Sequence, residues 1–222
     1  MLKLAVFDWN GTLLSDTRAC LDADNQGIKF FGGTPVNLKQ YRETIIIPSA
    51  TFYVQHGCSE EKIRKNIKKL GEVFHKYYEK RVAKCRGRKG VKEILKWLKA
   101  KSAASMIISN HTVKGIEFQL QRLGIKKYIL DVLANSSQNA SFKRRNKLEK
   151  LRKYIDAHNY KKNEIIIVGD SPEEVEIGRA LGIKSVAIEY GHYSTARLRA
   201  SKPDFLISNL GELKNIIKDN FK

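Results

Sequence analysis

Short apolar runs alternate with helix-like segments along most of the chain. Apolar runs of this kind are typical of strands that are buried on both faces of a parallel sheet. They lie at Leu4–Phe7, Ser105–Ser109, Tyr128–Leu133, Ile165–Val168, Ser185–Ile188 and, more weakly, Phe205–Ile207. Between them, apolar residues recur three and four positions apart, as on one face of an α-helix. The alternation predicts an α/β fold, with a Rossmann-like, doubly wound parallel sheet.

The stretch of residues 15–88 interrupts this alternation, with helical patterns and few strand-like runs. Its clearest pattern is a 4-3-4-3 spacing of apolar side chains, which predicts one amphipathic helix with Ser59 as its N-cap. The side chains with this spacing are Ile63, Ile67, Leu70, Phe74 and Tyr77. We therefore expect a core domain made of residues 1–14 and 89–222, and a mostly helical domain inserted at residues 15–88.

The composition is that of a globular chain with a strong positive charge. Of the 222 residues, 42% are hydrophobic and 29% are charged, which excludes a disordered or collagen-like protein. Lys and Arg number 42 and Asp and Glu 23, so the formal net charge is +19. Such an excess favours anionic partners, including phosphorylated ones.

The cysteines and the apolar runs indicate the cellular compartment in which the protein is found. Cys20, Cys58 and Cys85 lie far apart and lack the CxxC spacing of zinc sites, so a reducing environment is the natural interpretation. The apolar runs are too short to span a bilayer, and the N-terminus lacks the parts of a signal peptide. We expect a cytoplasmic protein with no membrane partner, and leave its oligomeric state open.

Polar residues follow several predicted strands, where open α/β sheets bind their ligands. The first strand ends in Asp8-Trp9-Asn10-Gly11-Thr12, which places a carboxylate on a tight turn beside backbone amides. This carboxylate could be a nucleophile, with the amides holding an oxyanion, or simply part of a polar turn. The second strand ends in Ser109-Asn110, where the hydroxyl could hold a phosphate oxygen or cap the next helix.

Two more elements follow along the chain. Lys143 or Lys147, near a helix start, could neutralise a carboxylate nucleophile and a transferring phosphoryl group. Both belong to a run of seven basic residues at Lys143–Lys153, for which a solvated helix face is the ordinary interpretation. Asp170, directly after Ile165–Gly169, could bind a hard cation such as Mg2+. Glu174 could support that cation or complete a capping box with Ser171.

In this order, the four elements resemble the motifs of the haloacid dehalogenase superfamily, specifically its phosphatase-like branch. The family's first motif, hhhhDxDGTL, corresponds to LAVFDWNGTL, and its second, a strand ending in Ser or Thr, to MIISNH. The third corresponds to KLEKL, which favours Lys147 over Lys143, and the fourth, hhhGDxxxDhxxGxxAGh, to IIIVGDSPEEVEIGRALGI. The resemblance covers Leu4–Thr12 and about Lys89 to Phe205, and the insertion takes the position of the family's helical C1 cap.

The resemblance implies a Mg2+-dependent phosphatase that acts on a small phosphorylated substrate. Asp8 would be the nucleophile that forms an aspartyl-phosphate, and Lys147 would orient it. The implied phosphate-binding residues are Gly11, Thr12, Ser109 and Asn110. The implied metal-binding residues are Asp8, Asp170 and Asn10 through its backbone carbonyl, with Glu174 steadying the metal's water shell.

Asn10 departs from the family pattern, in which a second Asp protonates the leaving group and then activates water. An amide cannot carry that proton, and the loss of a general acid–base costs roughly 10²–10⁴-fold in rate. The chain could therefore be a slow enzyme, an enzyme for good leaving groups such as acyl phosphates, or a weakly catalytic protein that binds a phosphorylated ligand or nucleic acid. A phosphatase for nucleotides or nucleic-acid ends is a further rival, although nucleic acid is not favoured.

Aromatic and histidine side chains outside the motifs could contact a ligand. His192 follows the fifth predicted strand and could reach the substrate, but we expect an exposed loop histidine. Four aromatic residues of the insertion could stack on a base or sugar, but their spacing predicts core packing. They are Phe52, Tyr53, Tyr77 and Tyr78. Trp9 is also expected to be a packing residue.

Overall fold

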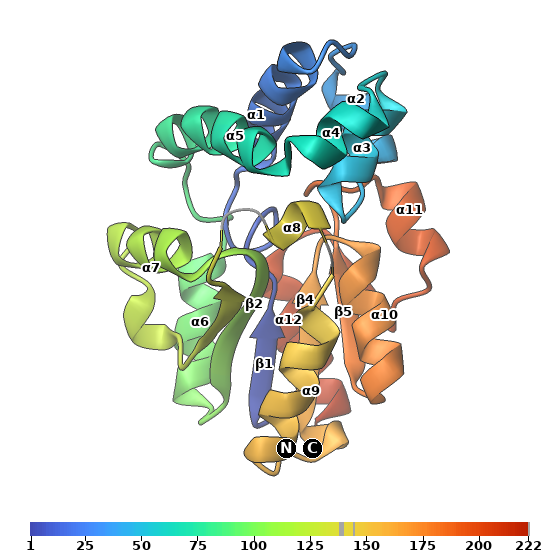
Figure 1. Ribbon diagram of the computed structural model, residues 1–222. Helices are drawn as coiled ribbons and strands as arrows, with labels where there is room; N and C mark the ends of the chain where they lie inside the picture. The colour runs from blue at the N-terminus through green and yellow to red at the C-terminus, as the bar shows by residue number, and fades with distance from the viewer. Residues whose placement is uncertain (138–139, 144, 222) are drawn as a thin grey trace.

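The computed structural model describes residues 1–137, 140–143 and 145–221. Its strands are β1 (Leu4–Phe7), β2 (Ala104–Thr112), β3 (Val132–Asn135), β4 (Ile165–Gly169), β5 (Lys184–Ile188) and β6 (Phe205–Ile207). They form one six-stranded sheet in the order β3-β2-β1-β4-β5-β6 (Figure 1), and each neighbouring pair is parallel.

Helices cover both faces of this sheet because successive strand residues point to opposite sides. Along β1, Ala5 and Phe7 join one hydrophobic cluster, and Leu4 and Val6 join the other. The first cluster includes residues of α6 (Val91–Ala100), α7 (Val113–Arg122) and α12 (Leu213–Asn220). The second includes residues of α9 (Lys147–Ala157) and α10 (Pro172–Leu181). The predicted doubly wound α/β fold is confirmed.

The helices between β1 and α6 lie beyond the carboxyl ends of the strands (Figure 1). They are α1 (Thr17–Phe30), α2 (Leu38–Thr44), α3 (Ser49–Gln55), α4 (Glu60–Lys65) and α5 (Ile67–Val82). The two chain segments that connect them to the core run side by side: Ser15 N donates to Arg86 O at 3.0 Å, and Arg88 N donates to Leu13 O at 2.8 Å. A helical insertion is therefore present, while its limits at residues 15 and 88 stay a prediction.

The remaining short elements surround the sheet. They are α8 (Ala140–Lys143), α11 (Thr195–Ala200) and the 3-10 turns Lys126–Tyr128, Lys162–Glu164 and Leu210–Glu212. The first of these turns corrects the sequence prediction of a strand at Tyr128–Leu133, because β3 begins only at Val132. Ile125 and Ile129 are buried on either side of the turn, so an apolar run reflects burial here and not an extended backbone.

The single amphipathic helix predicted after Ser59 is also wrong, since the structure has two helices that meet at Asn66. Asn66 leaves the helical backbone conformation, and its Nδ2 donates to Lys62 O at 2.8 Å, a local bond that competes with the helix. The inward face of the second helix also differs from the predicted one, because it continues from Phe74 to Tyr78, four residues later. Tyr78 is 1% exposed, whereas Tyr77, which the spacing placed on the apolar face, is 38% exposed.

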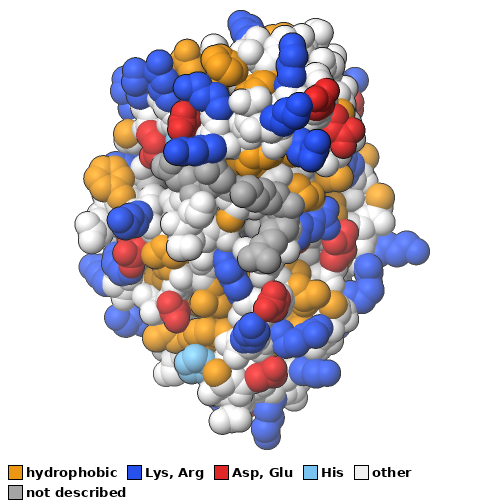
Figure 2. Space-filling view, in the orientation of Figure 1, with side chains coloured by type: hydrophobic (Ala, Val, Ile, Leu, Met, Phe, Trp, Pro, Cys, Tyr) orange, Lys and Arg blue, Asp and Glu red, His pale blue; other side chains and the backbone are white. Residues whose placement is uncertain are grey.

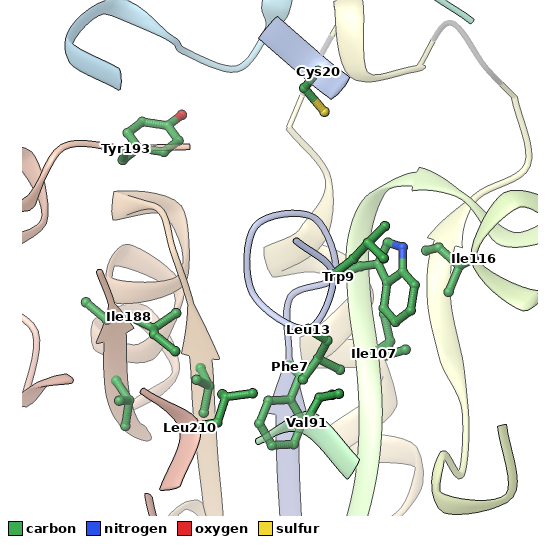
Figure 3. Close-up of a cluster of buried hydrophobic side chains, with 14 of the residues drawn as sticks. Phe7, Trp9, Leu13, Cys20, Val91, Ile107, Ile116, Ile188, Tyr193 and Leu210 are labelled. Carbon is green, nitrogen blue, oxygen red and sulfur yellow. The ribbon is translucent and has the colours of Figure 1, made fainter. Parts of the chain in front are cut away.

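The other aromatic predictions are confirmed. Phe52 and Tyr53 are fully buried among the inserted helices. Trp9 is fully buried in the hydrophobic cluster that also contains Ile107 and Ile116 (Figure 3). The packing of Trp9 anchors the loop that follows β1 in the hydrophobic core. The polar residues of this loop therefore lie at the carboxyl edge of the sheet.

Candidate active site

Asp8 lies at the carboxyl end of β1, beside the first residue of α9. Its Oδ1 accepts a hydrogen bond from Lys147 Nζ at 2.7 Å, and its Oδ2 accepts one from Thr12 Oγ1 at 3.4 Å. Asp8 is 6% exposed and Lys147 is 3% exposed. The structure thus brings together the predicted nucleophile and the lysine that the motif favours. The side chain of the alternative, Lys143, lies outside the described part of the chain.

Glu174 shares the same ammonium group. Its Oε1 accepts from Lys147 Nζ at 2.6 Å, and its Oε2 accepts from Ser171 Oγ at 2.6 Å. Ser171 caps α10 alone, by accepting from Glu173 N at 3.1 Å, so the capping-box interpretation of Glu174 is wrong. The side chain instead ties α10 to the start of α9 through the lysine, a contact that neither sequence interpretation included.

The carboxylates around Lys147 outnumber the positive charges. Burial raises the pKa of Asp8 to about 8, with repulsion from Glu174 and Asp170 adding to the rise and Lys147 opposing it. Burial would lower the pKa of Lys147, but Asp8 and Glu174 override this effect and raise the pKa well above its ordinary value. The lysine is therefore a permanent cation, and the site has an excess of negative charge that a further cation would relieve.

Asp170 lies at the end of β4, next to Asp8. Its Oδ1 is 3.2 Å from Thr12 Oγ1, the same hydroxyl that contacts Asp8, so Thr12 lies between the two carboxylates. Thr12 is fully buried at this position. The backbone of Gly11 passes so close that a Cβ there would lie 2.2 Å from Asp170 Oδ2, and its φ of +72° also favours glycine.

The groups that would hold Mg2+ are the carboxylates of Asp8 and Asp170 and the backbone carbonyl of Asn10. Oxygen donors of this type suit a hard cation that retains several water ligands. The observation that favours such a cation is that two buried carboxylates contact the same hydroxyl of Thr12, and the raised pKa of Asp8 agrees with it. The two oxygens of Glu174 already accept from Lys147 and Ser171. Glu174 would therefore influence the cation only indirectly, through the groups or water molecules that contact it.

His192 is not the exposed loop residue that the sequence suggested, because it is 8% exposed and packs against Asp170. Its backbone N donates to Asp170 Oδ2 at 2.5 Å, and its Nδ1 lies 3.0 Å from the same oxygen. Burial would lower the pKa of His192, but these contacts with Asp170, with the nearby Asp16 and Asp8, raise it to about 9. The sequence signal for this placement was the position of the Gly191-His192 loop after β5.

Asn10 faces a carboxylate that sequence reasoning missed. Its Nδ2 donates to Asp16 Oδ2 at 2.6 Å and lies 2.8 Å from the Tyr78 hydroxyl. Tyr78, on α5, donates to Asp16 Oδ2 at 2.7 Å, and Gly11 N donates to Asp16 Oδ1 at 2.8 Å. Asp16 is fully buried. In sequence it is an ordinary N-cap residue before α1, but its side chain makes no capping hydrogen bond.

The second strand contributes the remaining predicted residues. Ser109 is 1% exposed, and its Oγ accepts from His111 N at 3.0 Å and lies 3.5 Å from Asn10 Oδ1. Asn110 Nδ2 donates to Glu173 Oε2 at 2.8 Å. Ser109 and Asn110 line the same pocket as Asp8, whereas the amide of Gly11 donates to Asp16.

These residues open into one pocket of about 140 Å3 between the sheet and the inserted helices. From the core it is lined by Asp8, Asn10, Ser109, Asn110, Lys147, Asp170 and His192. From the inserted helices it is lined by Cys20, Asp24, Tyr41, Ile45, Phe74, His75 and Tyr78. The volume is below the roughly 300–1,000 Å3 of pockets for drug-sized ligands, which favours a small substrate.

Among the described residues, part of the basic run near α9 is paired or buried. Arg145 pairs with Glu176 at 2.9 Å, Lys153 with Glu149 at 2.8 Å, and Lys147 is buried at the site. On the face shown in Figure 2, Lys and Arg side chains are scattered among acidic and apolar ones. Among the described residues, every helix is too short or too polar to pass through a bilayer.

A family model described as haloacid dehalogenase-like hydrolase matches residues 5–188. The chain belongs to this family. This hydrolase is 26% identical over 225 aligned residues to a phosphoglycolate phosphatase from Vibrio vulnificus, covering 97% of this chain and 96% of that one.

Solved structures share its fold over almost the whole chain. A haloacid dehalogenase-like family hydrolase from Streptococcus pneumoniae gives a TM-score of 0.81 at 18% identity, covering 97% of this chain and 98% of that one. A predicted phosphoglycolate phosphatase from Haemophilus somnus gives 0.78 at 19% identity, covering 97% of each chain. The core sheet and the helical insertion are thus features of the fold that these hydrolases share.

Proposed function

We propose that this hydrolase is a Mg2+-dependent phosphatase that hydrolyses a small phosphorylated substrate through an aspartyl-phosphate on Asp8. The observation that carries the proposal is the placement of Asp8 between a buried lysine 2.7 Å away and the carboxylate of Asp170, with Thr12 shared by both. Mg2+ at Asp8 and Asp170 supplies charge that neutralises the phosphoryl oxygens and the crowded carboxylates.

In the first step, an Asp8 carboxylate oxygen attacks phosphorus. The new bond forms as the bond between phosphorus and the leaving oxygen breaks, and that oxygen takes its proton from solvent water because the amide of Asn10 has none to give. Lys147 holds Asp8 in position through its 2.7 Å hydrogen bond and stabilises the negative charge on the phosphoryl group. Ser109 and Asn110, at the end of the neighbouring strand, hold the phosphoryl oxygens.

In the second step, water attacks the phosphorus of the aspartyl-phosphate, which releases inorganic phosphate and restores Asp8. Asn10 lies where a carboxylate would move protons in both steps, but its amide only forms hydrogen bonds, as a donor to Asp16 and Tyr78 and as an acceptor from Ser109. Both steps are therefore slower than in a hydrolase with an acid at this position, and the phosphorylated enzyme is long-lived.

Phosphoglycolate is the first substrate to test. The relative from Vibrio vulnificus carries the name of a phosphatase for this compound and aligns over 97% of this chain. A pocket of about 140 Å3 also suits a compact phosphorylated molecule. Aryl and acyl phosphates should be turned over well, because their leaving groups depend less on protonation.

Asn10 supports one second candidate function, a protein that binds a phosphorylated ligand and turns it over weakly. The Asn10–Asp16 hydrogen bond of 2.6 Å gives the amide a structural role that does not require catalysis. A phosphatase for nucleotides or nucleic-acid ends is less favoured, because ion pairs with Glu176 and Glu149 engage part of the basic run.

The test is phosphate release from phosphoglycolate and from an aryl phosphate, with and without Mg2+, together with mass spectrometry of the acid-quenched protein. We expect turnover that a chelator abolishes and a phosphorylated peptide that contains Asp8. Asp8→Asn should remove both signals, whereas Asp219→Asn, at an exposed position, should leave both unchanged. Activity that survives chelation and dialysis, or phosphorylation at another residue, would refute the proposal.

A further inference from the structure

Three buried side chains that take no part in the proposed phosphoryl transfer come together beside the site. Asp16 and Cys20 are four residues apart at the start of α1, and His192 belongs to the loop after β5. One ligand atom from each, a carboxylate oxygen, a thiol sulfur and a ring nitrogen, lies within 4.8 Å of the other two. Figure 3 shows Cys20 on α1, above the loop that follows β1.

The orientation of His192 favours metal binding. Its Nδ1 lies 3.0 Å from the Asp170 carboxylate, which can only accept, so Nδ1 carries a proton. Its Nε2 is buried and has no hydrogen-bond partner among the described residues, although it lies 4.0 Å from Asp16 Oδ1. A histidine that donates one ring N–H to a carboxylate is the usual arrangement of a metal-bound imidazole, and a metal at Nε2 would displace the second proton of the imidazolium that Asp170 stabilises.

The spacing of the three donors suits a tetrahedral transition metal. Zinc bonds of about 2.0–2.3 Å place neighbouring ligand atoms roughly 3.5 Å apart. Cys20 Sγ lies 3.5 Å from Asp16 Oδ2, and His192 Nε2 lies 4.0 Å from the other oxygen, Asp16 Oδ1, so both donors approach the carboxylate at close to this spacing. Cys20 and His192 also line the pocket, which leaves a fourth position for water or substrate.

We propose that Asp16, Cys20 and His192 form a second metal site that binds Zn2+ and inhibits the hydrolase. The thiol and the imidazole select a softer cation than the oxygen donors of Asp8 and Asp170, which suit Mg2+. Coordination displaces the thiol proton of Cys20 and the Nε2 proton of the His192 imidazolium, and both protons are released to solvent. Bound Zn2+ would link α1 to the loop after β5. It would inhibit by displacing His192 from its position against Asp170.

Cobalt is the probe for the site, because a thiolate bound to Co2+ gives a charge-transfer band in the near ultraviolet. We expect one equivalent of Co2+ to give this band in the full chain when Mg2+ is in excess. Cys20→Ser should lose the band and weaken Zn2+ binding in equilibrium dialysis at least tenfold. Cys58→Ser and Cys85→Ser should keep both, and they serve as matched controls because each also removes a free thiol.

Activity gives a third readout, with Mg2+ again in excess. Zn2+ should inhibit the unsubstituted chain, and Cys20→Ser should need at least tenfold more Zn2+ for half-inhibition, with each protein compared with its own turnover in the absence of Zn2+. Equal inhibition in both proteins would mean that Zn2+ competes at Asp8 and Asp170, which would overturn the proposal. Absence of the Co2+ band in the unsubstituted chain would overturn it too. If Cys20→Ser does not fold, the controls still test the site, because loss of the band in Cys58→Ser or Cys85→Ser would also overturn the proposal.

Discussion

Around Lys147 the site is held by ion pairs within the core, whereas around Asn10 it is held by neutral and charged hydrogen bonds that reach the inserted helices. The lysine side consists of Asp8, Lys147 and Glu174, all from strand ends or helix starts of the core. The amide side consists of Asn10, Asp16 and Tyr78, where Tyr78 comes from α5. The contacts of the lysine side therefore all lie within the core, whereas the amide side includes a contact with the inserted helix α5.

The largest expected effect is on the lysine side, from Lys147→Met. Removing the cation leaves buried Asp8 and Glu174 unpaired, which should lower the free energy of unfolding by about 3–5 kcal/mol. Lys153→Met is the matched control in the same helix, since its exposed pair with Glu149 contributes no more than about 1 kcal/mol. Urea unfolding of both variants measures the difference, and similar losses would show that the lysine side does not depend on its ion pairs.

The raised pKa of Asp8, on the lysine side, predicts that the free energy of unfolding depends on pH when metal is chelated. The pKa of Asp8 is about 8 in the folded chain and 3.8 as its ordinary value, so the folded state binds more protons between these limits. Stability is then greatest below pH 4 for this group and falls as pH rises toward 8, by up to about 1.4 kcal/mol for each pH unit.

Asp8→Asn should remove this part of the slope, and Mg2+ should flatten the slope of the unsubstituted chain. Urea midpoints at several pH values, with a chelator or with Mg2+, provide the comparison. Asp24, whose pKa burial raises to about 7, contributes a slope of the same sign in both proteins and cancels in their difference. Parallel profiles for the two proteins would contradict the assignment of the excess charge to Asp8.

On the amide side, Tyr78→Phe removes the hydroxyl that joins α5 to Asp16. A hydrogen bond to a charged group contributes about 1.5–3 kcal/mol, and we expect a loss of stability in that range. Tyr77→Phe changes the neighbouring exposed tyrosine and should alter stability by less than about 0.5 kcal/mol. Equal effects of the two substitutions would mean that the amide side does not tie the insertion to the core.

The smallest expected effect is catalytic. Asn10→Asp would place a second carboxylate about where Nδ2 now lies 2.6 Å from Asp16, and two such acids share a proton. That proton can go to the leaving group, so turnover of alkyl phosphates should rise at least tenfold, about 1.4 kcal/mol of barrier. Aryl phosphates should gain less, and the phosphorylated Asp8 should become shorter-lived.

A series of substrates with different leaving groups, measured on both proteins, decides this point. Asn215→Asp, at an exposed position, controls for the added charge. An identical dependence on the leaving group in the two proteins would mean that another side chain already supplies the proton.

The lysine side and the amide side also differ in how many of their residues could be predicted from the sequence. Asp8, Lys147 and Asp170 could be proposed from motifs because parallel strands bring their carboxyl ends to one edge, so order along the chain already implies proximity. Asp16 could not, since before a helix it is indistinguishable from a cap. Tyr78 was expected to pack in the core, but its hydrogen bond to Asp16 could not be foreseen, because the two residues lie 62 positions apart in the sequence.

The two connections that run side by side at Leu13–Ser15 and Arg86–Arg88 bear on how such a protein can change over evolution. Because the inserted segment leaves and re-enters the core at neighbouring points, its ends are close together in space. A longer, shorter or unrelated segment could be substituted there without altering the order of the strands or threading the chain through the sheet. New specificity can then arise by replacing a whole module, while the strand ends that carry Asp8 and Asp170 are inherited unchanged.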